Sequence, residues 1–216
     1  MTPQGDYPAA QRFLEQSLSL YEELADQSGI ASSLNALAVS ARDRGDYAAA
    51  QTYFERSLAC WRLLSDRLAM ARCLHNLSNV VKVRGDYPRA QWALREATDI
   101  FVELGDGNGA AWSINQQGDI ARAQGDTIAA RELYERALFA FREAGDQWGS
   151  ARSLSDLGSI DCERGDHPAA RAAYREALEI FARLGLRRGT ARALEGSACL
   201  ALGVCPRIYL FSAEFT

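Results

Sequence analysis

Residues 154–178 of this 216-residue chain read LSDLGSIDCERGDHPAARAAYREAL, with the pair Gly165-Asp166 at the centre. The same pair recurs every 40 residues, at Gly5-Asp6, Gly45-Asp46, Gly85-Asp86 and Gly125-Asp126. Two further columns keep this spacing, Ala10/Ala50/Ala90/Ala130/Ala170 and Leu34/Leu74/Ile114/Leu154/Leu194. A fixed period of this length indicates a repeat architecture in which one supersecondary unit is copied along the chain.

Each unit has the pattern of two helices joined by short turns. Asp46 can accept hydrogen bonds from the free N–H groups of a first helical turn, and Gly45 can adopt the left-handed conformation that ends the preceding helix. Apolar and small residues follow at 3-4 spacing, which gives each helix one buried stripe. The stripes are Ala50, Tyr53, Phe54, Ser57, Leu58, Trp61 and Leu64 on the second helix of a unit, and Ile30, Ala31, Leu34, Leu37, Ala38 and Ala41 on the first. No βαβ alternation precedes residue 204, so the predicted fold is all-α, a stack of antiparallel hairpins.

The period also predicts the domain organisation. We expect a single array over residues 1–203, made of one second helix at 6–25, four full hairpins at about 28–184 and an unpaired first helix at 188–203. Each hairpin has an apolar face that it cannot bury alone, so neighbour interfaces should supply most of the stability. Because this array is out of phase with its repeat, we expect either a piece of a longer protein or end helices that complete one another in a homo-oligomer.

Residues 204–216 form a tail outside the repeat. Pro206 interrupts the helical pattern, and the apolar residues that follow are too few to span a membrane. Three interpretations are open for this tail: a disordered remnant, a cap that folds over the apolar end of the array, or a segment that lies in the groove of a neighbouring copy.

The repeated residues resemble the tetratricopeptide repeat (TPR) family. The resemblance rests on Leu154, Leu157, Gly158, Gly165, Asp166, Pro168, Ala170, Tyr174, Ala177 and Leu178, and again on Ile114, Gly118, Gly125, Asp126, Ala130, Tyr134, Ala137 and Leu138. The 40-residue period is similar to the long-helix arrays of G-protein/spindle regulators, kinesin light chains and bacterial signal-transducing regulators. Departures are small: Ala38, Ser78 and Ala198 stand where the family favours glycine, and Gln117 stands where it has leucine.

The resemblance implies a right-handed α-α solenoid of TPR helical hairpins. It further implies an interaction scaffold without chemistry of its own, in which the first helix of each hairpin lines a concave groove for partner peptides or helices. Fold alone does not establish a function, so the groove residues of this chain have to be considered individually.

The groove columns are predicted on the face of each first helix opposite its buried stripe, at the spacing of Ser32, Asn35, Val39 and Arg42. Across the units this face has six basic residues against two acidic ones, a net charge of +4 in a chain whose total is −4. Asp43 and Glu163 in the flanking column lower the value to +2. The candidate partner-binding residues are Asn35, Arg42, Arg72, His75, Asn79, Lys82, Trp112, Asn115, Asp119, Arg122 and Arg152.

These residue types suit a peptide partner with acidic groups. Arginine pairs bidentately with carboxylates, asparagine can satisfy an extended backbone, and Trp112, expected to be exposed, offers apolar contact area. Chaperone-tail-binding members of the family hold a carboxylate with a lysine in the column of His75 and an asparagine in the column of Asn79, so this sequence matches only half of that clamp. The alternative is a set of solvated surface residues without a partner.

The sequence supports two functions, a scaffold and a sensor, and only three of its residues suit a third, an enzyme. The leading prediction is a non-enzymatic scaffold that binds a partner peptide or helix, as part of a bacterial regulatory protein in the cytoplasm. The alternative is a domain that senses a ligand or signalling peptide in a transcriptional or signal-transduction regulator. An enzyme, such as a phosphatase on a TPR scaffold, would have to rely on Asn115, Gln116 and Asp119.

Composition argues against several other classes. With 48% hydrophobic and 24% charged residues, a disordered or fibrous chain is excluded. The net charge of −4 and the lack of a long apolar run predict no nucleic-acid or membrane partner. Five cysteines without a Cys-x-x-Cys pair, and two histidines far apart, predict reduced thiols and no metal or other cofactor. The segment 105–109, GDGNG, lacks the Lys-Ser/Thr of a phosphate-binding loop.

Overall fold

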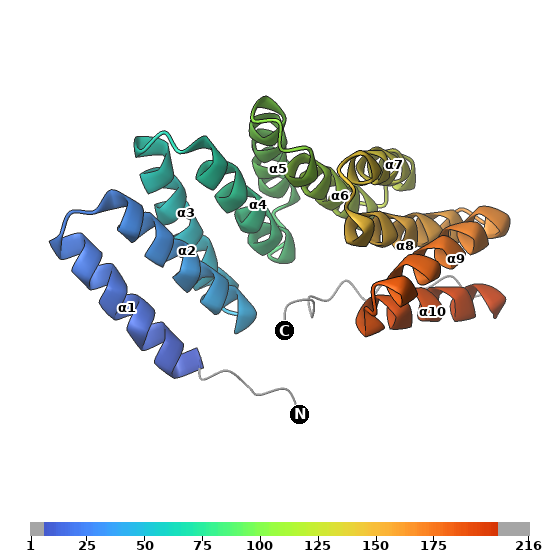
Figure 1. Cartoon of the computed structure of the whole chain (residues 1–216), viewed down its shortest axis with the longest axis horizontal. Coiled ribbons are helices and arrows are strands. Elements are labelled where there is room, and N and C mark those ends of the chain that lie inside the picture. The colour runs from blue at the N-terminus through green and yellow to red at the C-terminus, as the bar shows by residue number, and fades with distance from the viewer. Residues whose placement is uncertain (1–6, 203–216) are drawn as a thin grey trace. The chain divides into compact units, whose positions relative to one another are not determined.

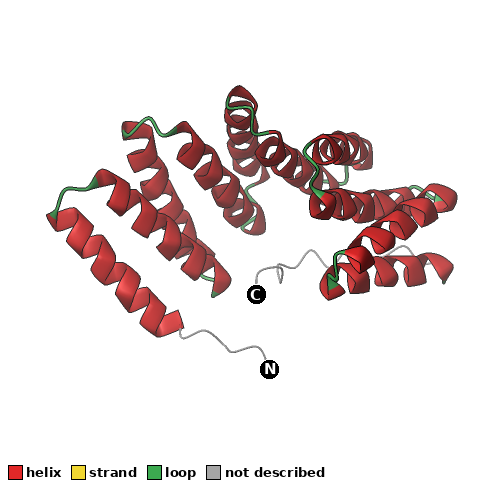
Figure 2. Cartoon of the chain, in the orientation of Figure 1, coloured by secondary structure: helices red, strands yellow, loops and turns green. Residues whose placement is uncertain are grey.

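The computed structural model describes residues 7–202, which form ten α-helices and no strand within that range (Figures 1 and 2). The helices are α1 (Tyr7–Glu23), α2 (Gln27–Asp43), α3 (Tyr47–Leu63), α4 (Arg67–Val83), α5 (Tyr87–Glu103), α6 (Gly107–Ala123), α7 (Thr127–Glu143), α8 (Gln147–Glu163), α9 (His167–Arg183) and α10 (Arg187–Ala201). The prediction of an all-α repeat fold is confirmed. The predictions for the tail at 204–216 lie outside the described residues. None of the ten helices is long and apolar enough to cross a membrane.

Short turns, each with an aspartate cap, separate most of the helices. Asp46 Oδ1 accepts a hydrogen bond of 3.0 Å from the Ala49 N–H at the start of α3, and Asp126 does the same for α7. Gly45 precedes the cap with φ at +80°, a conformation that favours glycine. The N–H of Asp46 then reaches back 2.9 Å to the Ala41 carbonyl, which closes the end of α2. The predicted role of the Gly-Asp pair is therefore confirmed.

Three turns have another residue in place of the glycine or the aspartate of the Gly-Asp pair. Ala25 and Ser65 take the place of the glycine and have φ of 53° and 55°. Such values strain a residue that carries a Cβ. At the start of α10, Leu186 stands where the other turns have aspartate, and the helix begins without a side-chain cap. The repeat geometry is therefore kept in turns where either the glycine or the aspartate is missing.

The helices group into two compact units, whose described parts are residues 7–100 and 101–202. Unit 1 holds α1 to α4 and most of α5, and unit 2 holds the last turn of α5 and α6 to α10. Within the units, α2 packs against α3, α6 against α7 and α8 against α9 as hairpins. We call α2, α4, α6, α8 and α10 the first helices, and the others the second helices.

Aromatic rings of the second helices pack against small residues of the first helices. Tyr134 of α7 is fully buried, and a Cβ at Gly118 of α6 would lie only 2.6 Å from its ring. The column of Gly118 carries Ala38 in α2 and Ser78 in α4, which are also buried and small. In unit 1, the Ser57 hydroxyl of α3 donates a 2.8 Å hydrogen bond to the Ala31 carbonyl of α2. Small residues at these positions let the two backbones of a hairpin approach.

Candidate functional site

The predicted site residues all lie on first helices, and they divide between the two units. Unit 1 carries Asn35 and Arg42 on α2, and Arg72, His75, Asn79 and Lys82 on α4. Unit 2 carries Trp112, Asn115, Asp119 and Arg122 on α6, and Arg152 on α8. We call the two sets the unit 1 face and the unit 2 face. They differ in how their charges are balanced.

The unit 1 face is basic because α4 contains no carboxylate. This helix carries Arg67, Arg72 and Lys82, and its sequence RLAMARCLHNLSNVVKV has no acidic residue. Arg72 is exposed and forms no hydrogen bond or ion pair with the described residues. On α2, the Arg42 guanidinium binds Asp43, with its Nη2 at 2.9 Å from Oδ1. Asp43 is the only carboxylate of α2, so α2 and α4 together have a positive net charge.

His75 is the one histidine of the unit 1 face, and it lies on α4. Burial of its ring lowers its pKa to about 4, and the positive charges of Lys82 and Arg42 act in the same direction. The His75 ring therefore feels the positive charge of Arg42 on α2 as well as that of Lys82 on its own helix. Three amide side chains of the same two helices are half-buried: Asn35, Asn79 and also Asn76, which the sequence did not single out. The unit 1 face therefore combines positive charge with uncharged hydrogen-bonding groups.

The low pKa of His75 predicts that the protein loses stability in mild acid. An unfolded histidine has a pKa near 6.5, so between pH 6.5 and about 4 the unfolded chain binds more protons than the folded one. The free energy of unfolding should therefore fall by up to about 3 kcal/mol as the pH drops through this window. Urea titrations of wild type and His75→Asn at pH 7 and pH 4.5 measure the effect.

The matched control for this experiment is His167→Asn, because His167 is exposed at the start of α9. His75→Asn should remove much of the loss of stability between pH 7 and pH 4.5, whereas His167→Asn should leave it unchanged. An equal pH dependence in all three proteins would show that His75 is not the group responsible.

On the unit 2 face, the arginines form ion pairs with carboxylates of the same unit. Arg122 Nη2 lies 2.6 Å from Glu163 Oε1 on the next first helix. Arg152 Nε lies 3.2 Å from Asp156 Oδ2, and Arg152 Nη2 lies 3.6 Å from Asp119 Oδ2. The positive charge expected for this part of the face is therefore already compensated by carboxylates of the same unit.

Asp156 was not predicted as a site residue, although it organises this cluster. Its carboxylate is buried and accepts hydrogen bonds from Arg152 of α8, from Arg192 of α10 and, at 3.4 Å, from Asn115 Nδ2 of α6. One carboxylate thus connects three first helices. Asn115 is itself buried, and its Oδ1 has no hydrogen-bond partner among the described residues. Asn115 is therefore not available on the surface, contrary to the prediction.

Trp112 of the unit 2 face packs against other aromatic side chains of unit 2. Its ring lies edge-on to Phe141, with centroids 4.8 Å apart, and 4.5 Å from the ring of Trp148. Its Nε1 donates a 3.3 Å hydrogen bond to Asp146. The indole is half-buried, so the prediction of an exposed aromatic anchor was wrong.

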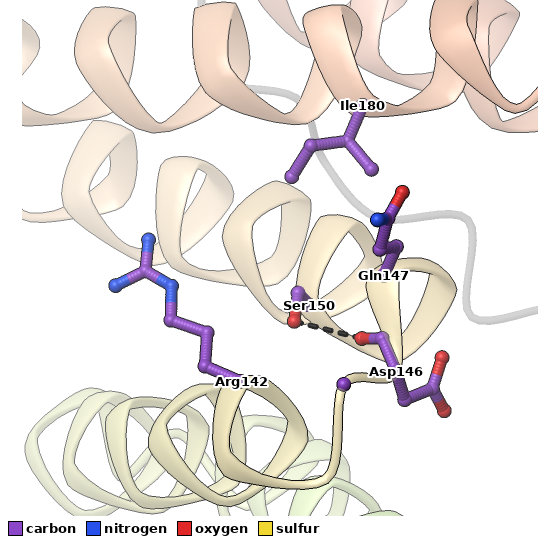
Figure 3. Close-up of a pocket in the computed structure, with 6 residues that line it drawn as sticks. Arg142, Asp146, Gln147, Ser150 and Ile180 are labelled. Atoms are coloured by element: carbon purple, nitrogen blue, oxygen red, sulfur yellow. Dashed lines mark hydrogen bonds between the residues drawn. The ribbon is translucent and has the colours of Figure 1, made fainter.

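Two hollows of unit 2 are lined by other residues than the predicted ones. One, of about 260 Å³, lies beside the turn between α7 and α8 and is lined by Arg142, Gly145, Asp146, Gln147, Ser150 and Ile180 (Figure 3). In Figure 3 the Ser150 hydroxyl donates to the Asp146 carbonyl oxygen, at 2.8 Å. A second hollow of about 700 Å³ lies between α7 and α9, next to Leu138 and Ala173. Neither contains a predicted site residue.

The described residues contain no group of three or more side chains that could hold a metal ion. The four cysteines in this part of the chain are free thiols, and burial raises the pKa of Cys73 to about 12. A thiol with so high a pKa stays protonated and is a poor nucleophile.

Comparison with known protein families gives one consistent result. The tetratricopeptide repeat family model matches residues 2–62, 29–103 and 109–183, which together cover most of the chain. A comparison with curated proteins finds no significant match.

Solved structures with a similar fold are distant in sequence. BtubC (BKLC) from P. vanneervenii is similar over 99% of both chains, with a TM-score of 0.70 and 15% identity. The apo form of RapI is similar over 90% of this chain and 72% of its own, with a TM-score of 0.81 and 16% identity. A Rap protein complexed with Competence and Sporulation Factor is similar over 92% of this chain and 61% of its own, with a TM-score of 0.64 and 18% identity. At these identities the likeness concerns the fold alone.

Proposed function

This chain belongs to the tetratricopeptide repeat family, and we propose that it is a non-enzymatic scaffold whose first helices bind a partner protein or peptide through the unit 1 face. The partner in this proposal presents an acidic segment, as an extended peptide or as a helix. The setting is a bacterial regulatory protein in the cytoplasm. No step of this proposal requires catalysis, a metal or another cofactor.

The observation that carries the proposal is the charge difference between the two faces. On the unit 2 face Arg122 and Arg152 already contact carboxylates of the same unit, so a partner would have to displace those contacts. On the unit 1 face, Arg72 and Lys82 lie on α4, a helix without a carboxylate, and Arg72 is exposed and forms no hydrogen bond or ion pair with the described residues. Arginine binds carboxylates bidentately, and neighbouring amides can bind a partner's backbone. An acidic segment is therefore the partner chemistry that the unit 1 face fits.

Charge reversal tests this assignment. We expect Arg72→Glu with Lys82→Glu to weaken binding of a deca-glutamate peptide by about 30-fold, because two attractive contacts become repulsive and each is worth up to about 1 kcal/mol. The control variant Arg95→Glu with Arg136→Glu changes the net charge equally, at exposed positions on second helices. Isothermal titration calorimetry at low and moderate salt measures all three proteins, and deca-lysine serves as the control peptide.

Three results would contradict the proposal. They are an absence of binding to wild type, equal losses in the two double variants, and equal affinity for deca-lysine. Chemical-shift changes at the His75 ring on addition of deca-glutamate would independently support contact with the unit 1 face, because the charges of Arg42 and Lys82 both act on that ring.

The second candidate function is the sensing of a small effector. It is supported by the similarity to a Rap protein complexed with Competence and Sporulation Factor. A sensor should gain thermal stability from a small ligand alone, since binding to the folded state stabilises it by mass action. A melting-temperature screen with short peptides and metabolites distinguishes the two: a hit without any protein partner favours the sensor.

A further inference from the structure

The outermost helices of the described part expose small and apolar side chains in columns that are buried or partly buried in the rest of the repeat. On α10, Leu194 is 53% exposed, whereas Leu34, Leu74 and Leu154 in the same column are buried. Ala191 and Ala198 are exposed too, although the equivalent residues of α2, α4, α6 and α8 are buried. We call Ala191, Leu194 and Ala198 the α10 patch.

Helix α1 shows the complementary pattern. Phe13 is 69% exposed, and Ala10 is exposed although Ala50, Ala90, Ala130 and Ala170 in its column are fully buried. Ser17 is half-buried where Ser57 and its other equivalents are fully buried. We call Ala10, Phe13 and Ser17 the α1 patch.

Inner hairpins show what normally covers each patch. Tyr134 of the second helix α7 covers Gly118 of the first helix α6, and Gly118 is the equivalent of Ala198. Ser57 of the second helix α3 reaches the carbonyl of Ala31, the equivalent of Ala191. Among the described residues, the α10 patch therefore lacks a second helix, and the α1 patch lacks a first helix.

We propose that the α10 patch of one copy binds the α1 patch of a second copy, so that the two helices form a hairpin of the same kind as α8 with α9. In this arrangement Ala10 takes the place of Ala170, Leu14 that of Tyr174 and Ser17 that of Ala177, and each is of the small or apolar type that the column carries elsewhere. The interface continues the packing pattern of the repeat. This inference is independent of the proposed partner at the unit 1 face.

Charge complementarity supports a second copy as the occupant. Helix α10 carries Arg187, Arg188 and Arg192 against Glu195, whereas α1 carries Glu15, Glu22 and Glu23 against Arg12. The two helices thus have opposite net charges, which favours pairing of α10 with α1 over pairing of α10 with a second α10. The contact uses different surfaces on the two copies, so it is heterologous and can continue from copy to copy.

Complementary blocking variants test the proposal. Leu194→Glu blocks the α10 patch and Phe13→Glu blocks the α1 patch; both residues are exposed, so both variants should fold, which far-ultraviolet circular dichroism checks. By sedimentation velocity of the full chain, we expect wild type to assemble with rising concentration and each variant to stay monomeric. An equimolar mixture of the two variants should form a dimer, because each retains the patch that the other needs. Leu63→Glu, at a 79% exposed position on α3, is the control and should assemble like wild type.

Several outcomes would overturn this inference. A wild type that stays monomeric at every concentration would exclude the contact, as would a Leu63→Glu variant that loses assembly to the same extent. Assembly of Phe13→Glu alone would indicate pairing through two α10 patches. Loss of assembly on deletion of residues 204–216, with both patches intact, would assign the contact to that segment instead.

Discussion

Replacing Phe141 with alanine is expected to lower the free energy of unfolding by about 3–5 kcal/mol, the range for truncation of a fully buried phenylalanine. The Phe141 ring is buried where α6, α7 and α8 meet. It contacts Trp112 on one side, and on the other a Cβ at Gly149 would fall 2.4 Å from it. Because three helices contribute walls, the cavity cannot close by movement of one side chain, and unit 2 should lose most of this contact energy.

Phe139→Ala is the matched control, since Phe139 lies on the same helix and is 68% exposed. Urea titrations followed by circular dichroism should place the control within about 0.5 kcal/mol of wild type. Losses of equal size in the two variants would contradict the packing described for Phe141.

Gly149→Ala tests the contact between Gly149 of α8 and the Phe141 ring of α7. Alanine is favoured over glycine in a helix by up to about 1 kcal/mol, but in wild type its Cβ would collide with the Phe141 ring. We therefore expect Gly149→Ala to destabilise wild type and to stabilise the Phe141→Ala protein. Equal effects in both backgrounds would mean that the two residues are not coupled.

The fold could be predicted from the sequence because its signals are local and repeated. Gly45 and Asp46 illustrate this, because the left-handed residue and the cap act within one turn and recur every 40 residues. Leu186 shows the limit of such reasoning: α10 begins there without the aspartate cap, although Gly185 keeps the left-handed turn with φ at +69°.

The candidate site was harder to predict because it depends on distances between helices. Asp156 lies one residue beyond the column of Asn115 and Ser155, so the spacing assigned it to no face. In the folded unit it is close enough to neutralise Arg152 and Arg192. A helical period gives the direction of a side chain, whereas the depth of a residue between two first helices depends on how closely those helices pack. For this reason the excess of positive charge on α4 was predictable, and the compensation on unit 2 was not.

Replacing Asp156 with alanine is expected to cost about 3 kcal/mol, near the low end of the range for removing one partner of a buried ion pair. The variant would leave Arg152, Arg192 and Asn115 without the carboxylate they share. The arginine side chains are 20% and 36% exposed, so solvent can compensate part of the loss. Urea titrations measure the change, and Glu132→Ala, an exposed carboxylate on α7, is the control that should stay within about 0.5 kcal/mol.

The destabilisation by Asp156→Ala should arise mainly from Arg152 and Arg192, which remain without their carboxylate. A second substitution that removes Arg152 should therefore restore part of the stability. In α2 the positions equivalent to Arg152 and Asp156 are Ser32 and Ala36, so this fold accepts a small, uncharged pair at the same place. Arg152→Ala combined with Asp156→Ala should therefore be more stable than Asp156→Ala alone, by about 1 kcal/mol or more. If the two losses simply add, the buried carboxylate stabilises unit 2 through contacts other than its pairing with Arg152.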